Sequence, residues 1–124
     1  MKALVQTAKA LSDTNRIRIL AALGCGEVCV CQLVELLKLA HSTVSKHLSI
    51  LSQAGLVECR KSGRWIHYRL PKANRASLAA RMTDLVLREL TEDDAAIQDQ
   101  KNLKRILRMD TEKLCSLQKQ KRAS

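Results

Sequence analysis

The sequence predicts a mainly α-helical domain with one β-hairpin, an α+β fold class, and three observations support this prediction. Apolar residues recur at helical spacing in four segments within the first 55 residues. Two β-rich runs follow, separated by Ser62-Gly63-Arg64, which is typical of a hairpin turn. A further helical stripe lies between residues 73 and 90. Helix–helix–helix–helix–hairpin–helix is the order of a winged helix-turn-helix, with the hairpin as its wing.

The first three helices are short. One is predicted over residues 2–11, and a second follows a cap at Ser12 or Asp13 and ends at Gly24-Cys25-Gly26. The third is expected at about residues 30–39.

The fourth helix is expected from about residue 42 to residue 54. Its buried positions at i, i+4 and i+7 are Val44, Leu48 and Leu51, and Gly55 follows at the C′ position.

The hairpin is predicted from residues 56–61 and 65–70. Alternate residues of the second strand are expected to point into the core: Ile66, Tyr68 and Leu70. The residues between them are expected to point outward: Trp65, His67 and Arg69. Cys59, on the first strand, is expected in the core.

The helix predicted over residues 73–90 carries an apolar stripe that, with the first helix, is a candidate dimer seam. The stripe and its partners are Leu78, Met82, Leu85 and Val86 with Leu4 and Leu11. Thr91-Glu92-Asp93-Asp94 resembles a capping box and predicts a further helix start.

The charge of the chain predicts a polyanionic partner. The formal net charge is +10 and the pI is about 9.8. Residues 1–90 hold 14 Lys and Arg against 6 Asp and Glu, whereas residues 91–124 hold 8 against 6. The excess positive charge therefore belongs to the folded module. Because Phe is absent and Trp65 and Tyr68 are the only other aromatic residues, base stacking on an aromatic platform is disfavoured, and double-stranded DNA is favoured over a single strand.

The fourth helix begins with small polar residues, which can reach base edges in a major groove. The exposed polar face is His41, Ser42, Thr43, Ser45, Lys46 and His47. We expect Ser, Thr and His to contact bases or phosphates and Lys46 to contact phosphate. The wing adds three basic residues for backbone or minor-groove contact: Arg60, Lys61 and Arg64. Residues 1–90 are thus predicted to form a DNA-binding and dimerisation domain. Residues 91–124 are predicted to form a C-terminal helical extension, frayed over residues 119–124.

Two thiols, Cys29 and Cys31, lie just before the predicted recognition helix and its supporting helix. A Cys-X-Cys pair is a ligand or redox site, so thiol chemistry is expected to control DNA binding. The five cysteines are odd in number, and the chain shows no signal peptide and no apolar run of membrane-span length. We therefore expect reduced thiols in the cytoplasm, no membrane contact and no disulfide framework.

Five stretches, in order over roughly residues 1–90, resemble the ArsR/SmtB family of metalloregulatory repressors, and within it the arsenic-responsive ArsR branch. They are Leu11–Leu20, Glu27–Leu33, Ser45–Leu48, Ala54–Val57 and Gly63–Leu70. The resemblance implies a homodimer that binds an operator palindrome in double-stranded DNA, represses transcription and leaves the DNA when an inducer binds.

The resemblance also implies that the inducer is As(III) or Sb(III), held by two or three thiolates, with no permanent cofactor. Soft thiolates select such soft ions. The family's zinc sensors use Asp and His on the last helix, but no His follows His67, and its cadmium and lead sensors use N-terminal cysteines, which residues 1–24 lack. The branch's third cysteine is replaced by Val34. The third ligand is therefore open between Cys25, which lies near Cys29 and is preferred, Cys115, and none or an exogenous thiol.

Other functions remain as alternatives. A thiol redox-sensing repressor, a Cd/Pb/Zn sensor of the same family and an inducer-independent architectural protein each keep the DNA-binding module. An enzyme is disfavoured, because no Cys is followed six residues later by the Arg of a phosphatase-like arsenate reductase, and Cys-X-X-Cys is absent.

The spacing of Cys29 and Cys31 sets a geometric condition on the switch. On a regular helix they point about 200° apart with Cβ atoms roughly 7 Å apart. Two thiolates on one ion come within roughly 4 Å of each other. Ligation must therefore unwind the first turn if both residues are helical, but needs little change if both lie in an extended segment.

Overall fold

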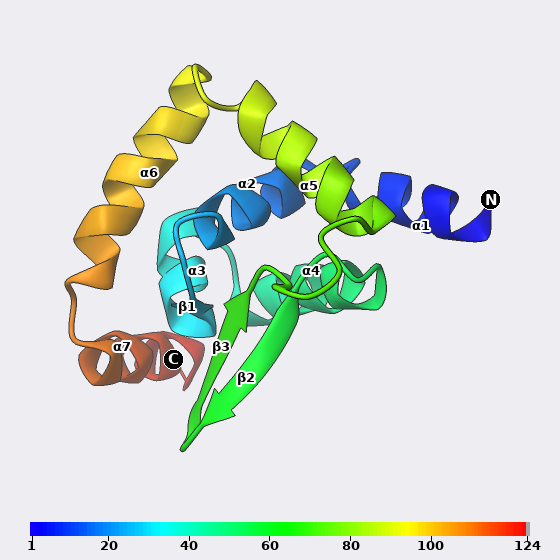
Figure 1. Cartoon of the computed structure of the whole chain (residues 1–124). Helices are drawn as coiled ribbons and strands as arrows, with labels where there is room; N and C mark the ends of the chain where they lie inside the picture. Colours follow the sequence, from blue (N-terminus) through cyan, green and yellow to red (C-terminus); the bar gives the residue numbers. More distant parts are fainter. Residues whose placement is uncertain (124) are drawn as a thin grey trace.

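The computed structural model describes residues 1–123, which form seven helices and three strands (Figure 1). The elements are α1 (Lys2–Ala10), α2 (Thr14–Leu23), β1 (Val28–Cys29), α3 (Val30–Leu37), α4 (His41–Gln53), β2 (Glu58–Ser62), β3 (Trp65–Arg69), α5 (Leu78–Glu89), α6 (Asp94–Leu107) and α7 (Thr111–Ala123). This order confirms the predicted winged helix-turn-helix. The expected fraying of residues 119–124 falls on α7, which is helical as far as Ala123, and on Ser124, which lies outside the described residues.

The sheet has the order β1-β3-β2, with both pairings antiparallel. The hairpin of β2 and β3 closes at the Ser62–Trp65 pair, and Gly63 supplies the positive φ of 61° that the turn requires. β1 was not predicted, because it contributes only two residues, Val28 opposite Tyr68 and Cys29 opposite His67. It joins the wing directly to the start of α3.

A side-chain cap defines the start of α2, and a backbone cap defines the end of α4, the predicted recognition helix. Asp13 caps α2, with its carboxylate accepting from the backbone N–H groups of Asn15 (2.8 Å) and Arg16 (3.2 Å). Burial opposes ionisation of this carboxyl, but those two hydrogen bonds prevail and lower its pKa. At the end of α4, Gly55 has φ +73°. The amide of Leu56 donates to the carbonyl of Leu51 as in a Schellman motif, as the sequence indicated.

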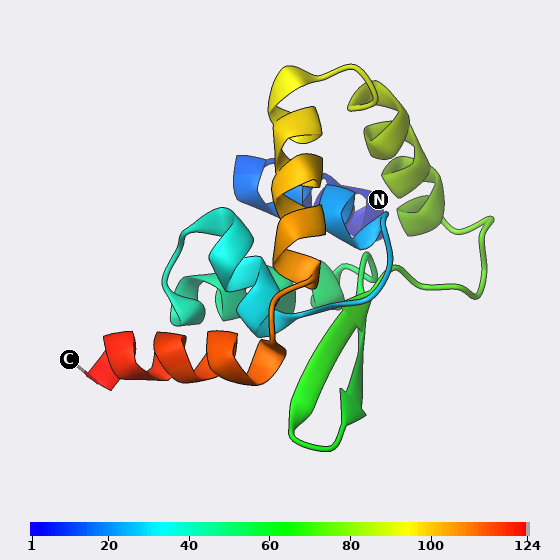
Figure 2. The same cartoon turned by 90° about the vertical axis from the view of Figure 1, so that its left-hand side faces the viewer.

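One hydrophobic core joins the helix-turn-helix to the C-terminal helices. Val44, Leu48 and Leu51 of α4 are fully buried in it, as predicted. Leu103 and Ile106 of α6 and Leu114 of α7 belong to the same cluster. α6 packs on α2 and α3, and α7 packs on α3 (Figure 2). Arg18 of α2 forms an ion pair with Asp99 of α6 at 2.7 Å, which joins the two helices.

One helix start and one helix cap differ from the predictions. α5 begins at Leu78 rather than at residue 73, because Asn74 adopts a left-handed conformation and the Ser77 hydroxyl caps the amide of Ala80. α6 begins where a start was expected, but its cap is Asp93, whose carboxylate accepts from the amide of Ala96, and not Thr91.

The expected burial of the wing is partly wrong. Tyr68 and Leu70 pack against the core, but Ile66 is 38% exposed and Cys59 is exposed. Cys59 lies on β2, the strand that is separated from β1 by β3. Ile66 lies near the hairpin tip, which extends beyond the helical core (Figure 1). Within the described part of the chain, no helix has the length and apolar character needed to cross a membrane.

Candidate functional site

Cys29 and Cys31 lie on either side of a strand-to-helix boundary. Cys29 is extended, with φ −87° and ψ 162°, and is the N-cap residue of α3. Its amide donates to the Gln32 side chain at 2.9 Å, and the residue is only 3% exposed. Cys31 is the second residue of α3. The two geometries considered from the sequence had both cysteines helical or both extended. Neither applies, because Cys29 is extended and Cys31 is helical.

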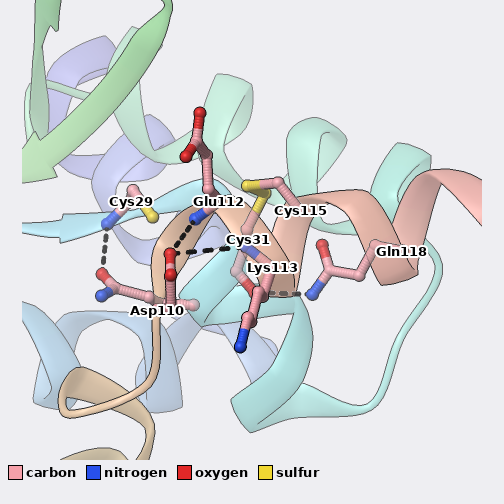
Figure 3. The surroundings of a disulfide bond; sticks show 8 residues. Cys29, Cys31, Asp110, Glu112, Lys113, Cys115 and Gln118 are labelled. Atoms are coloured by element: carbon pink, nitrogen blue, oxygen red, sulfur yellow. Dashed lines mark hydrogen bonds between the residues drawn. A yellow bond between two sulfur atoms is a disulfide. The ribbon is translucent and has the colours of Figure 1, made fainter.

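Cys31 is joined by a disulfide to Cys115 of α7, 84 residues later in the chain (Figure 3). Their Cα atoms are 5.6 Å apart. The expectation of reduced thiols throughout was therefore wrong for this pair, and the reason is the path of the C-terminal helices. α6 carries the chain across α2 and α3, and α7 then returns beneath α3 (Figure 2). Cys25, Cys29 and Cys59 are free thiols.

α7 is also held at α3 by contacts that do not involve sulfur. The Gln118 side chain donates to the carbonyl oxygen of Cys31 at 2.8 Å. The Asp110 carboxylate accepts from the amide of Glu112 at 2.9 Å at the start of α7 (Figure 3), and Leu114 is buried in the core. These contacts place Cys115 beside Cys31.

The three cysteines Cys29, Cys31 and Cys115 line one open groove of about 780 Å³. The start of α4 contributes His41 and Ser45 to its wall. The wing and α7 contribute further residues, among them Arg64, Trp65, Ile66, Tyr68, Glu112 and Lys113. The groove therefore connects the thiols with both predicted DNA-contacting elements.

Cys25 does not belong to this groove. It lines a separate cavity of about 290 Å³ between α2, α5 and α6. Its sulfur is 3.9 Å from the carbonyl oxygen of Ala21 and 4.0 Å from the side-chain nitrogen of Gln100. Cys25 and Cys29 are thus close in sequence but line different cavities. Among residues 1–123 as they stand, no three His, Cys, Asp or Glu side chains are arranged to hold a metal ion.

The polar face predicted on α4 is present, with its members in two environments. Ser42, Thr43, Ser45 and Lys46 are exposed. His41 and His47 are half-buried. The Nδ1 atom of His47 lies 3.2 Å from Nη1 of Arg16 on α2, so this imidazole is held toward α2.

The basic residues of the wing lie along the strand and at the tip. Arg60 is in the middle of β2, opposite His67, and its guanidinium pairs with Glu27 at 2.7 Å. This hydrogen bond lowers the pKa of Glu27, against a smaller opposing effect of burial, so the pair is ionised at neutral pH. Lys61 is exposed. Arg64, at the tip, forms an ion pair with Glu112 of α7 and lies 5.2 Å from the centre of the Trp65 ring. α7 thus contacts both α3 and the wing.

Comparison with known proteins places this chain in a family. The model of the arsR family of bacterial regulatory proteins matches residues 13–58. The arsenical resistance operon repressor of Escherichia coli (strain K12) is 42% identical over 67 residues, which are 53% of this chain and 57% of that protein. The repressor of the same name from Staphylococcus aureus is 40% identical over 72 residues, 58% of this chain and 69% of that protein. The chain therefore spans only a little over half of the E. coli relative.

Relatives with other names match similar lengths. A cadmium resistance regulatory protein CadC homolog from Staphylococcus aureus is 38% identical over 63 residues, 50% of this chain and 52% of that protein. A transcriptional repressor SmtB homolog from Synechocystis is 43% identical over 61 residues, 49% of this chain and 46% of that protein.

The fold agrees with these matches. The homodimeric winged helix-turn-helix DNA-binding domain Mb0332 from Mycobacterium bovis superposes with a TM-score of 0.62 and 31% identity, covering 73% of this chain and 81% of that one. Family model, relatives and solved structure all describe transcriptional regulators rather than enzymes. This chain belongs to the ArsR family of bacterial regulatory proteins.

Proposed function

We propose that this protein is a cytoplasmic transcriptional repressor that binds operator DNA as a homodimer and leaves it when As(III) or Sb(III) binds cysteine thiolates. One observation carries the proposal. Cys29 and Cys31 line the same groove as the start of α4 and the wing residue Arg64. A ligand bound at those thiols therefore lies against the elements that contact DNA.

Arsenic is favoured over zinc by the chemistry of the groove. Its candidate ligands are sulfur atoms, which suit a thiophilic ion that takes two or three thiolates, whereas structural zinc sites take four ligands. The relatives named for arsenical resistance support this assignment. The SmtB and CadC homologs make a zinc or cadmium sensor the alternative within the family.

Replacing Lys46 with Ala is expected to weaken DNA binding about equally for all sequences, because an exposed Lys at the start of a recognition helix contacts phosphate. It should also reduce the slope of log affinity against log salt by about 2, since a dimer loses one such contact in each protomer. Ser42→Ala should instead relax sequence preference, since a hydroxyl there can contact a base edge. Fluorescence anisotropy with the operator and a scrambled duplex, across a salt series, measures both effects. Ser49→Ala, on an exposed position later in α4, is the matched control. If Lys46→Ala and Ser42→Ala both bind as the parent does, α4 is not the recognition helix.

The dimer interface is proposed to be formed by α1 and α5, which leave large apolar side chains uncovered. Leu4 is 51% exposed, Val5 is 46% exposed and Leu85 is 52% exposed. Leu85→Lys is expected to convert a dimer into a monomer, because it places a charge in an apolar contact. Leu107→Lys, at a 41% exposed position on α6, is the control and should stay dimeric. Sedimentation velocity at micromolar concentration distinguishes the two, and a monomeric parent would contradict the proposed seam.

A second candidate function, a redox-responsive repressor, is favoured by the Cys31–Cys115 disulfide. In that case oxidation alone should change operator affinity, and Cys115→Ser should abolish the response to oxidant while arsenite has no effect on either protein.

A further inference from the structure

We propose that Cys115 of α7 is the third inducer ligand, so that the metalloid site consists of Cys29, Cys31 and Cys115 and bridges α3 and α7. This inference rests on the proposed function and adds a ligand from a helix 84 residues away from Cys31. It also excludes Cys25 as a ligand, although the sequence favoured Cys25 as the third one.

The first argument is the approach of two sulfur atoms. Cys31 and Cys115 are close enough to share a disulfide, with Cα atoms 5.6 Å apart. Two thiolates bound to one ion need sulfur atoms within roughly 4 Å of each other, given metal–sulfur bonds of about 2.3 Å. Once reduced, this pair reaches that separation by small side-chain rotations. No other two cysteines of the described chain are joined in this way.

The second argument is that α7 stays in place when the disulfide is opened. Two of its contacts with α3 and the core are independent of sulfur. These are the hydrogen bond from Gln118 to the carbonyl of Cys31 and the buried Leu114 side chain. Reduction therefore leaves two thiols facing each other across a packed interface. Such a preorganised pair binds an ion at a lower entropic cost than two thiols on separate mobile segments.

Cys29 completes the set because it lines the same groove and lies two residues before Cys31. The Cys29 side chain is buried beside the junction of β1, α3 and α7 (Figure 3). It leaves its capping position to bind, which loosens the first turn of α3. The two remaining cysteines are excluded by position, because Cys25 lines a different cavity and Cys59 is exposed on β2.

A cellular dithiol is the reductant that opens the Cys31–Cys115 disulfide before arsenite binds. The dithiol gives two electrons and two protons to the Cys31–Cys115 disulfide and becomes a disulfide itself. Arsenite, As(OH)₃, then exchanges its three hydroxyl groups for the sulfurs of Cys29, Cys31 and Cys115 and releases three water molecules. Arsenic remains trivalent throughout. The oxidised protein has only Cys29 free at this site and is expected to bind arsenite far more weakly.

The site has a direct connection to the wing. Glu112 lies three residues before Cys115, about one helical turn away, and pairs with Arg64 at the wing tip. Movement of α7 when Cys115 takes up arsenic therefore shifts the partner of a predicted DNA-contacting arginine. This gives the inducer a second route to the DNA face, besides the loosening of α3.

X-ray absorption at the arsenic edge tests the ligand set. The protein is reduced with a phosphine, so that no exogenous thiol supplies sulfur, and is loaded with one equivalent of arsenite. The parent is expected to show three sulfur neighbours around arsenic, and Cys115→Ser two sulfurs with one oxygen and at least a tenfold weaker affinity. Cys25→Ser and Cys59→Ser should match the parent. Circular dichroism of Cys115→Ser checks that it is folded.

The outcomes separate this inference from the proposed function. Three sulfur neighbours in Cys115→Ser, or loss of one in Cys25→Ser, would overturn the assignment of Cys115 and leave Cys29 and Cys31 as ligands. Absence of arsenic–sulfur bonding in the reduced parent would instead overturn the proposed inducer itself.

Discussion

Reduction of the Cys31–Cys115 disulfide is expected to lower the free energy of unfolding by about 4 kcal/mol. The bond closes a loop with a sequence separation of 84 residues. A cross-link over a loop of this length removes chain entropy from the unfolded state worth roughly 4–5 kcal/mol. For a small domain this is a large part of the total stability, which is about 5–15 kcal/mol. Urea unfolding with and without a phosphine reductant measures the difference.

Matched serine variants separate this effect from reduction elsewhere. Cys115→Ser without reductant should unfold at the same urea concentration as the reduced parent, and adding reductant should not change it further. Cys25→Ser should behave as the parent in both conditions, because Cys25 is exposed and unpaired by disulfide. If the parent unfolds at the same urea concentration with and without reductant, the disulfide is not formed in solution.

The Cys29→Ser/Cys31→Ser double variant is expected to bind operator DNA as the parent does but to need at least a hundredfold more arsenite for release. Serine introduces a capping oxygen at position 29 and leaves the backbone amide free to donate to Gln32, so α3 should remain folded. Two of the proposed thiolates are lost, and arsenic binds serine oxygen much less well than sulfur. Anisotropy of labelled operator DNA under reducing conditions gives both quantities in one titration.

The control for this prediction is the Cys25→Ser/Cys59→Ser double variant, which removes the same number of thiols away from the groove. It should release DNA at the parent's arsenite concentration. Release of the Cys29/Cys31 variant at that same concentration would place the inducer site elsewhere in the molecule.

Local patterns in the sequence were sufficient to predict the winged helix-turn-helix order, but not β1 or the start of α5. The buried positions of α4 and the glycine after it appear as helical spacing and a C′ signal, and the structure contains both. β1 was missed because two residues carry no detectable periodicity, and its strand character comes from pairing with β3. The start of α5 was set too early because the left-handed Asn74 cannot be distinguished by composition from a helical asparagine.

The sequence indicated two of the proposed ligands, Cys29 and Cys31, but did not indicate that Cys115 lies beside them. Cys29 and Cys31 are close together in the chain, so their spacing made them candidate ligands. The place of Cys115 beside Cys31 depends on the turn between α6 and α7 and on the packing of α7 against α3, which are long-range features. The apolar residues Leu103, Ile106 and Leu114 did indicate that the C-terminal segment packs, but not where.

The central claim, that a trivalent metalloid controls DNA binding, is tested most directly by one titration series. The reduced protein is held on labelled operator DNA while arsenite, antimonite, cadmium and zinc are added separately, and anisotropy reports release. We expect arsenite and antimonite to release the DNA at concentrations near that of the protein, and cadmium and zinc to require far more. Release by zinc or cadmium at lower concentration than by arsenite, or no release by arsenite at all, would contradict this account.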